Sequence, residues 1–89
     1  MHLANVIGRA SGTLKDPPMT GIKLLVVQPV DGAGNETGPS EIVTDAVGAG
    51  IGDTVLVATG SAARQPAAMR GVATDASAIM IVDDVAIQD

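Results

Sequence analysis

The chain is built around a glycine-rich turn and the strand that follows it, which read Asp45-Ala46-Val47-Gly48-Ala49-Gly50-Ile51-Gly52-Asp53-Thr54-Val55-Leu56-Val57-Ala58-Thr59-Gly60-Ser61-Ala62-Ala63-Arg64. A dinucleotide-binding loop needs Gly-x-Gly-x-x-Gly leading into a helix, and a Walker loop needs a Lys-Ser or Lys-Thr pair. Here Gly48, Gly50 and Gly52 alternate, no such pair is present, and an apolar strand-like run follows. The pattern therefore predicts a tight strand-to-strand turn that uses positive φ angles, and not a phosphate-binding loop.

Asp45 is predicted to brace this turn. It lies on the same face of its predicted strand as Val43 and Val47, where a carboxylate is costly unless it accepts hydrogen bonds. The glycine turn that follows offers backbone N–H groups for that purpose. We favour this structural role over acid–base catalysis or a simply exposed side chain. A leucine at Gly50 is expected to disturb the turn, through a steric clash or the loss of a positive φ.

Apolar and β-branched runs predict five strands, at residues 3–14, 22–30, 41–47, 53–59 and 79–87, with Asp83-Asp84 interrupting the last. The first alternates small apolar and mostly polar residues up to Leu14, and its glycines, Gly8 and Gly12, are expected to mark bends. Ser61 is expected to cap a short helical segment that continues towards residue 70. The segments 15–21 and 31–39 are rich in proline or glycine and are predicted to be loops.

Five antiparallel strands of this length are too few for a sandwich and close best into a barrel, which removes exposed sheet edges. We therefore predict a mainly β fold, a single domain over residues 1–89, built as a small five-stranded OB-like barrel with one short helical segment. The second strand is apolar on both faces, with Leu24 and Val26 on one face and Leu25 and Val27 on the other. Its outer face is expected to be covered by a neighbouring subunit.

The composition excludes several classes of protein. The chain has 89 residues, no cysteine, no aromatic residue and a formal net charge of −5. Disulfides and thiolate metal sites are therefore excluded, and nucleic acid is not an expected partner. No apolar run approaches the roughly 20 residues of a membrane span and no signal-peptide pattern is present, so we expect a soluble cytoplasmic protein without a membrane partner. A core without aromatic rings in so short a chain is marginal, which favours oligomerisation.

The polar residues form no catalytic set. The single histidine, His2, lies at an amino end that is expected to fray, and it cannot complete a catalytic triad or a metal cluster. Asp75, Asp83 and Asp84 lack the spacing of a calcium loop and are expected to form a solvated acidic face. Arg64 is expected to pair with a carboxylate, within the chain or between chains. We therefore expect no enzyme activity, no cofactor and no bound metal.

Four stretches, in order over nearly the whole chain, carry a family resemblance. They are Val6-Ile7-Gly8 with Gly12-Thr13, residues 21–29, residues 45–57 running into Gly60-Ser61-Ala62-Ala63-Arg64, and Asp75-Ala76 with residues 79–83. Together they resemble the bacterial microcompartment vertex proteins, the pentameric shell family that includes EutN and CcmL. Two positions depart from the family pattern: Ala62 stands where a second serine is common, and Ala73-Thr74-Asp75 replaces a usual Pro-Val-Asp.

The resemblance implies a cyclic homopentamer that caps the fivefold vertices of a polyhedral shell in the bacterial cytoplasm, beside hexameric and trimeric shell proteins. It implies that Gly60, Ser61 and Ala62 line a narrow central opening. Arg64, which follows them, is expected to be a brace or a subunit-interface residue. The loop with Lys15 and Met19, or the 31–39 loop, is expected to reach the outer rim and contact a hexamer. By its position alone, Met19 either folds back on the protein or contacts a neighbour.

An alternative from a different class also fits the barrel. Such a fold can serve as an OB-like module that binds a small ligand or peptide, or as a non-catalytic subunit of an enzyme complex. The number of copies in solution separates the two hypotheses, since five copies indicate a shell protein and a monomer contradicts it.

Overall fold

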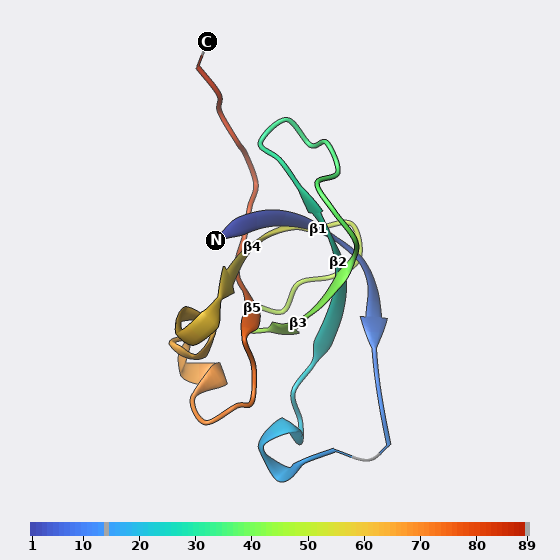
Figure 1. The fold of residues 1–89 in the computed structure, drawn as a ribbon, viewed down its shortest axis with the longest axis vertical. Helices are drawn as coiled ribbons and strands as arrows, with labels where there is room; N and C mark the ends of the chain where they lie inside the picture. Colours follow the sequence, from blue (N-terminus) through green and yellow to red (C-terminus); the bar gives the residue numbers. More distant parts are fainter. Residues whose placement is uncertain (14, 89) are drawn as a thin grey trace.

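A computed structural model describes residues 1–13 and 15–88 and contains five strands and three short 3₁₀ turns. The elements, in chain order, are β1 (His2–Ala10), η1 (Pro17–Met19), β2 (Leu24–Val30), β3 (Glu41–Asp45), β4 (Thr54–Thr59), η2 (Gly60–Arg64), η3 (Ala67–Met69) and β5 (Ala76–Ile81). The strands form a closed barrel in the order β1-β2-β3-β5-β4 (Figure 1). The predicted mainly β, five-stranded closed barrel is confirmed.

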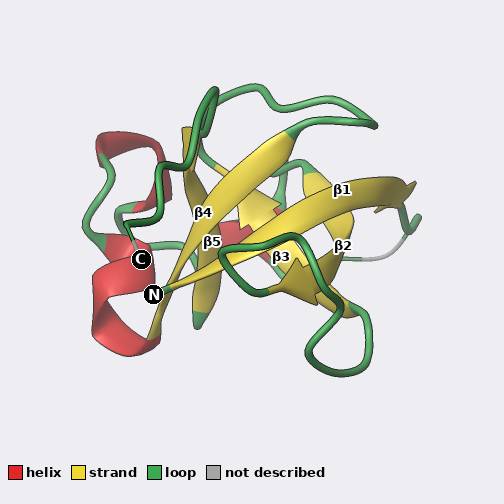
Figure 2. Ribbon diagram, turned by 90° about the horizontal axis from the view of Figure 1, so that it is seen from above, coloured by secondary structure: helices red, strands yellow, loops and turns green. Residues whose placement is uncertain are grey.

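All strand pairs in the barrel are antiparallel except β3 with β5, which run parallel over two residue pairs. This short contact closes the barrel, because it joins the edge that β3 would otherwise leave open. The helical turns η2 and η3 lie together beside β4 and β5 (Figure 2). The single predicted helical segment is therefore two 3₁₀ turns, and a third turn, η1, begins where Pro17 and Pro18 fix the backbone of the predicted loop.

The interior of the barrel is filled by small aliphatic side chains, which suits a cylinder of only five strands. The core contains Ala4, Val6, Leu25, Val27, Val43, Ala49, Val55, Val57 and Ala78. The predicted division of the second strand is present: Leu25 and Val27 are buried, whereas Leu24 and Val26 point outward and are half-buried. The strand begins at Leu24 and not at Ile22.

A β-bulge in β1 changes which residues face the interior. The register shifts between Val6 and Gly8, where we expect a bend, and leaves Ile7 exposed. Directly paired residues of an antiparallel ladder share a face. After the bulge Arg9 is paired with the buried Leu25, so the simple alternation predicted up to Leu14 is wrong beyond the bulge. The strand ends at Ala10, and the predicted end at Leu14 lies outside the described residues.

The last strand is displaced from its prediction. It runs from Ala76 to Ile81 and not from residue 79 to residue 87. Its partner β4 has six residues, and Val82 donates to the Thr54 carbonyl at 2.8 Å where that strand begins. Residues 83–88 therefore have no strand to pair with in the described chain, despite their alternating pattern. They extend away from the barrel as a tail (Figure 1).

Candidate functional site

The glycine turn holds its own carboxylates. Asp45 Oδ1 accepts hydrogen bonds from the backbone N–H groups of Val47, Gly48 and Ala49 at 3.1, 2.9 and 3.2 Å. Asp53 Oδ2 accepts one from Gly50 N–H at 2.8 Å. These N–H groups already donate to protein carboxylates, so the turn has no ready cradle for a phosphate.

Positive φ is confined to the two outer glycines of this turn, with φ of 76° at Gly48 and 97° at Gly52. Gly50 has no positive φ, and a Cβ there would lie 3.9 Å from Asp53 Oδ2, an ordinary contact. The predicted positive φ at Gly50 is therefore wrong, and a Cβ alone meets no clash there, whereas a clash of the longer leucine side chain stays a prediction. Glycine is therefore required at positions 48 and 52, since residues with a side chain rarely adopt a positive φ.

The segment predicted to line a central opening lies on η2. Gly60, Ser61 and Ala62 are all exposed, whereas the next residue, Ala63, is buried. Gly60 has φ of 63°, and its N–H donates to the Asp75 carbonyl at 2.8 Å. The hydrogen bond to Asp75 thus anchors the start of η2, and the small residues Gly60, Ser61 and Ala62 remain exposed.

A buried polar network fixes η2 on the barrel. Ser77 Oγ donates to the Ala63 carbonyl at 2.7 Å and lies 2.6 Å from Thr44 Oγ1. Thr44 Oγ1 also lies 3.0 Å from Thr74 Oγ1. This network was not predicted from the sequence, although a serine and a threonine within otherwise apolar strands were a signal for it.

Arg64 does not pair with a carboxylate in the described chain. Its Nη1 donates to the Thr74 carbonyl at 2.9 Å, and the side chain is otherwise exposed. The guanidinium therefore ties the end of η2 to the segment before β5. A bond to a carboxylate on another chain stays a prediction.

His2 is not frayed, contrary to expectation. It begins β1, is half-buried, and its Nε2 lies 2.5 Å from Glu41 Oε1. In residues 1–13 and 15–88, no three His, Cys, Asp or Glu side chains gather as metal ligands, and Asp75, Asp83 and Asp84 are exposed. Over the same residues, no helix has the length and apolar character needed to cross a membrane.

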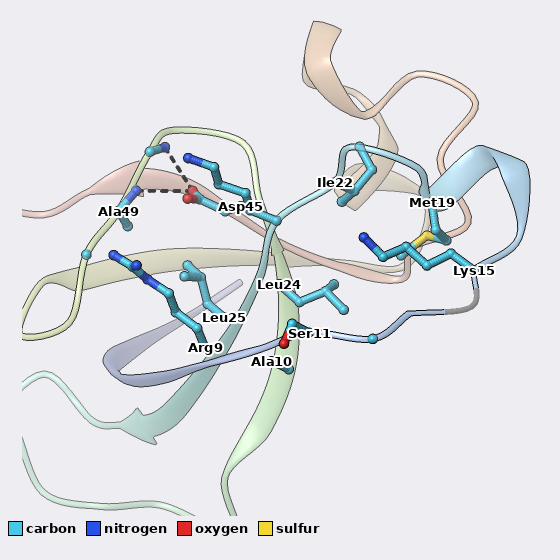
Figure 3. A pocket seen from close by; sticks show the side chains of 14 residues that line it. Arg9, Ala10, Ser11, Lys15, Met19, Ile22, Leu24, Leu25, Asp45 and Ala49 are labelled. Atoms are coloured by element: carbon cyan, nitrogen blue, oxygen red, sulfur yellow. Dashed lines mark hydrogen bonds between the residues drawn. The ribbon is translucent and has the colours of Figure 1, made fainter.

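A cavity of about 790 Å³ lies between the glycine turn and the segment that joins β1 to β2 (Figure 3). Lys15 and Met19, the predicted rim residues, both line it; Lys15 is exposed and Met19 is half-buried. Arg9 and Lys23 also line it. This cavity could not be predicted from the sequence, because only the bulge in β1 brings Arg9 to the face of Leu25.

The 31–39 loop is organised by Asp31. Its Oδ1 accepts hydrogen bonds from the N–H groups of Ala33 and Asn35, both at 2.9 Å. The hydrogen bond from the Asn35 backbone is the largest of the causes that hold the pKa of Asp31 below its ordinary value. Asp31 is exposed and braces its own loop.

The fold and these contacts define a small, closed OB-like β-barrel whose polar groups mostly serve its own turns. The family described as ethanolamine utilisation protein EutN/carboxysome matches residues 1–83, and the chain belongs to this EutN/CcmL family.

Relatives of known role cover almost the whole chain. The carboxysome shell vertex protein CcmL of Synechocystis sp. is 44% identical over 96% of this chain and 85% of its own length. The microcompartment shell vertex protein PduN of Salmonella typhimurium is 40% identical over 93% of this chain and 96% of its own. The solved structure of GrpN from Rhodospirillum rubrum, a pentameric microcompartment shell protein, superposes with a TM-score of 0.89 at 39% identity, covering 99% of this chain and 100% of that one.

Proposed function

We propose that this chain forms a cyclic homopentamer that caps the fivefold vertices of a polyhedral bacterial microcompartment shell. The observation that carries the proposal is the near full-length similarity, in sequence and in structure, to vertex proteins, one of which is pentameric. The same similarity supports a location in the shell, within the bacterial cytoplasm. The role is structural and not enzymatic.

The outer surface of the barrel supports self-association. The outward-facing residues Leu3, Leu56 and Met80 occupy neighbouring positions across β1, β4 and β5, and Met80 is 51% exposed. On other strands, Val26 is paired with Ile42, which is also 51% exposed. A cyclic pentamer is held by contacts between two different surfaces of each subunit. The barrel offers two apolar surfaces on different strands for such a contact.

The central opening is proposed to be lined by Gly60, Ser61 and Ala62. Their small side chains are exposed on a turn that is anchored through Ala63, which suits a position where five copies crowd around one axis. Arg64 is proposed to brace this turn, and Asp45, Gly48, Gly50 and Gly52 to form the structural turn at the other end of β4.

Hexameric and trimeric shell proteins are the proposed outer partners. Lys15 and Met19 are proposed rim contacts, on the loop that projects at the end of the barrel opposite the C-terminal tail (Figure 1). Their contribution is to the assembly of the shell and not to the pentamer itself.

Native mass spectrometry of the purified full chain tests the pentamer. Five copies are expected, and a monomer at micromolar concentration would overturn the proposal. Co-expression with shell hexamers tests the capping role: shells made with the chain should be closed, and shells made without it should be open at their vertices and leak. Closed shells of normal leak rate without the chain would contradict that role.

A further inference from the structure

The cavity beside the glycine turn gathers most of the positive charge of the chain. The full sequence has five lysine and arginine residues against ten acidic ones, and three of the five, Arg9, Lys15 and Lys23, line this one cavity. The chain as a whole has a net charge of −5, whereas this cavity is lined mainly by positively charged side chains. A small anion is attracted to such a local group of cations even though the net charge of the chain is negative.

These cations have no carboxylate partner in the part of the chain that the structure describes. Within residues 1–13 and 15–88, the only contact within 4.0 Å between a basic and an acidic side chain is that of His2 with Glu41, so Arg9, Lys15 and Lys23 make none. Asp45 lines the same cavity, and its Oδ1 accepts hydrogen bonds from three backbone N–H groups. Three cations therefore line the cavity together with this one carboxylate, and the balance of charge there is positive.

The remaining wall of the cavity is apolar. Leu25, 1% exposed, and Leu24 and Met19, both half-buried, line it. Figure 3 shows that the Arg9 side chain extends towards Ala49 of the glycine turn, and that Lys15 lies beside Met19 on the segment between β1 and β2. The volume of about 790 Å³ lies within the roughly 300–1,000 Å³ of small-molecule sites, which typically combine apolar walls with a few charged groups.

We propose that this cavity binds a small organic anion that carries a phosphate or carboxylate group. The anionic group would lie among Arg9, Lys15 and Lys23, where an arginine fork can bind two oxygens and lysine adds a point charge. The carbon portion would pack on Leu24, Leu25 and Met19. The proposal goes beyond the vertex function, and it shares Lys15 and Met19 with the proposed rim contacts.

The test measures binding of three probes to the intact full-length assembly by calorimetry: inorganic phosphate, succinate and phenyl phosphate. Saturable binding of phosphate or succinate is expected, and phenyl phosphate should bind more tightly than phosphate because its ring contacts the apolar wall. Absence of saturable binding for every probe would overturn the site. Equal affinity for phosphate and phenyl phosphate would overturn the apolar part of the proposal.

Matched variants assign the binding to this cavity. Arg9→Gln and Lys23→Gln should each weaken phosphate binding about tenfold, since hydrogen bonds to charged groups are the stronger ones. Arg70→Gln makes the same change in net charge at an exposed residue outside the cavity and should leave the affinity unchanged. Equal weakening in all three variants would show a general charge effect and overturn the proposal.

The copy number of each variant, measured by native mass spectrometry, separates this proposal from the vertex function. A pentamer that binds no probe overturns the ligand site alone, and a monomer that binds phosphate overturns the vertex function alone. Unchanged circular dichroism spectra show that the variants are folded.

Discussion

Ser77 Oγ donates a hydrogen bond of 2.7 Å to the carbonyl oxygen of Ala63, and both residues are fully buried. This contact joins strand β5 to the turn η2, whose exposed residues are proposed to surround the fivefold axis. Thr44 lies on the other side of Ser77, at 2.6 Å, and β3 is thereby tied into the same network. The conformation of the exposed turn η2 therefore depends on Ser77, a fully buried residue.

Ser77→Ala is predicted to lower the free energy of unfolding by about 1–3 kcal/mol, because it leaves the buried Ala63 carbonyl without the hydroxyl that donates to it and removes one partner of the Thr44 hydroxyl. Urea unfolding monitored by circular dichroism measures the loss. Ser61→Ala is the matched control, since Ser61 is exposed and should change stability by less than about 0.5 kcal/mol. Equal effects of the two substitutions would contradict the anchoring role of Ser77.

The glycines of the turn should differ in their tolerance of alanine. Gly48→Ala is predicted to cost about 1–2 kcal/mol, because φ there is 76°. Gly50→Ala removes the same hydrogen from a residue with no positive φ and with room for a Cβ, so it should be close to neutral. Thermal unfolding of the two variants decides; a larger loss at Gly50 than at Gly48 would refute the account.

Asp45→Ala is predicted to destabilise the chain by about 1–3 kcal/mol, since three backbone N–H groups lose their acceptor. Asp45→Asn keeps a carbonyl oxygen at that position and should cost clearly less. Urea unfolding at neutral pH compares the two. If the asparagine variant is as unstable as the alanine variant, the loss of stability does not come from the missing hydrogen-bond acceptor.

Asp31 is predicted to titrate below its ordinary pKa of 3.8, because the folded loop donates N–H groups to the ionised form. A lowered folded pKa means that the stabilisation is complete above the unfolded value and is lost as the pH falls through the folded value. Carbon-detected NMR of the side-chain carboxyl gives the midpoint. A midpoint at or above the ordinary value would contradict the hydrogen bonds to Asn35 and Ala33.

A cysteine placed at Ser61 tests the position of η2 in the assembly. The chain has no cysteine of its own, so Ser61→Cys provides a single thiol per subunit. A short bifunctional maleimide should link neighbouring subunits of the pentamer through this residue. Ser40→Cys, exposed in the loop before β3, should be linked much less efficiently. Efficient linkage at Ser40 with none at Ser61 would place a different part of the barrel at the axis.

Local patterns in the sequence were sufficient for the barrel itself. The β-branched runs, the glycines between them and the absence of a long helical period predict five short strands, and five such strands close into a barrel. The hydrogen bonds to Asp45 were also foreseeable, because a carboxylate directly before a glycine turn has N–H groups within reach. These features depend on residues a few positions apart, where steric and hydrogen-bonding rules act within one segment.

Only the tertiary structure decided the features that depend on pairing between distant segments. The bulge between Val6 and Gly8 places Arg9 on the face of Leu25, and strand β5 ends where β4 has no further residue to pair with it. Ser77 reaches Ala63 because the barrel closes at that point. A shift of one residue in strand register moves a side chain to the opposite face. The sequence by itself thus determined the barrel, and the register of its strands decided where the charges and the anchored turn lie.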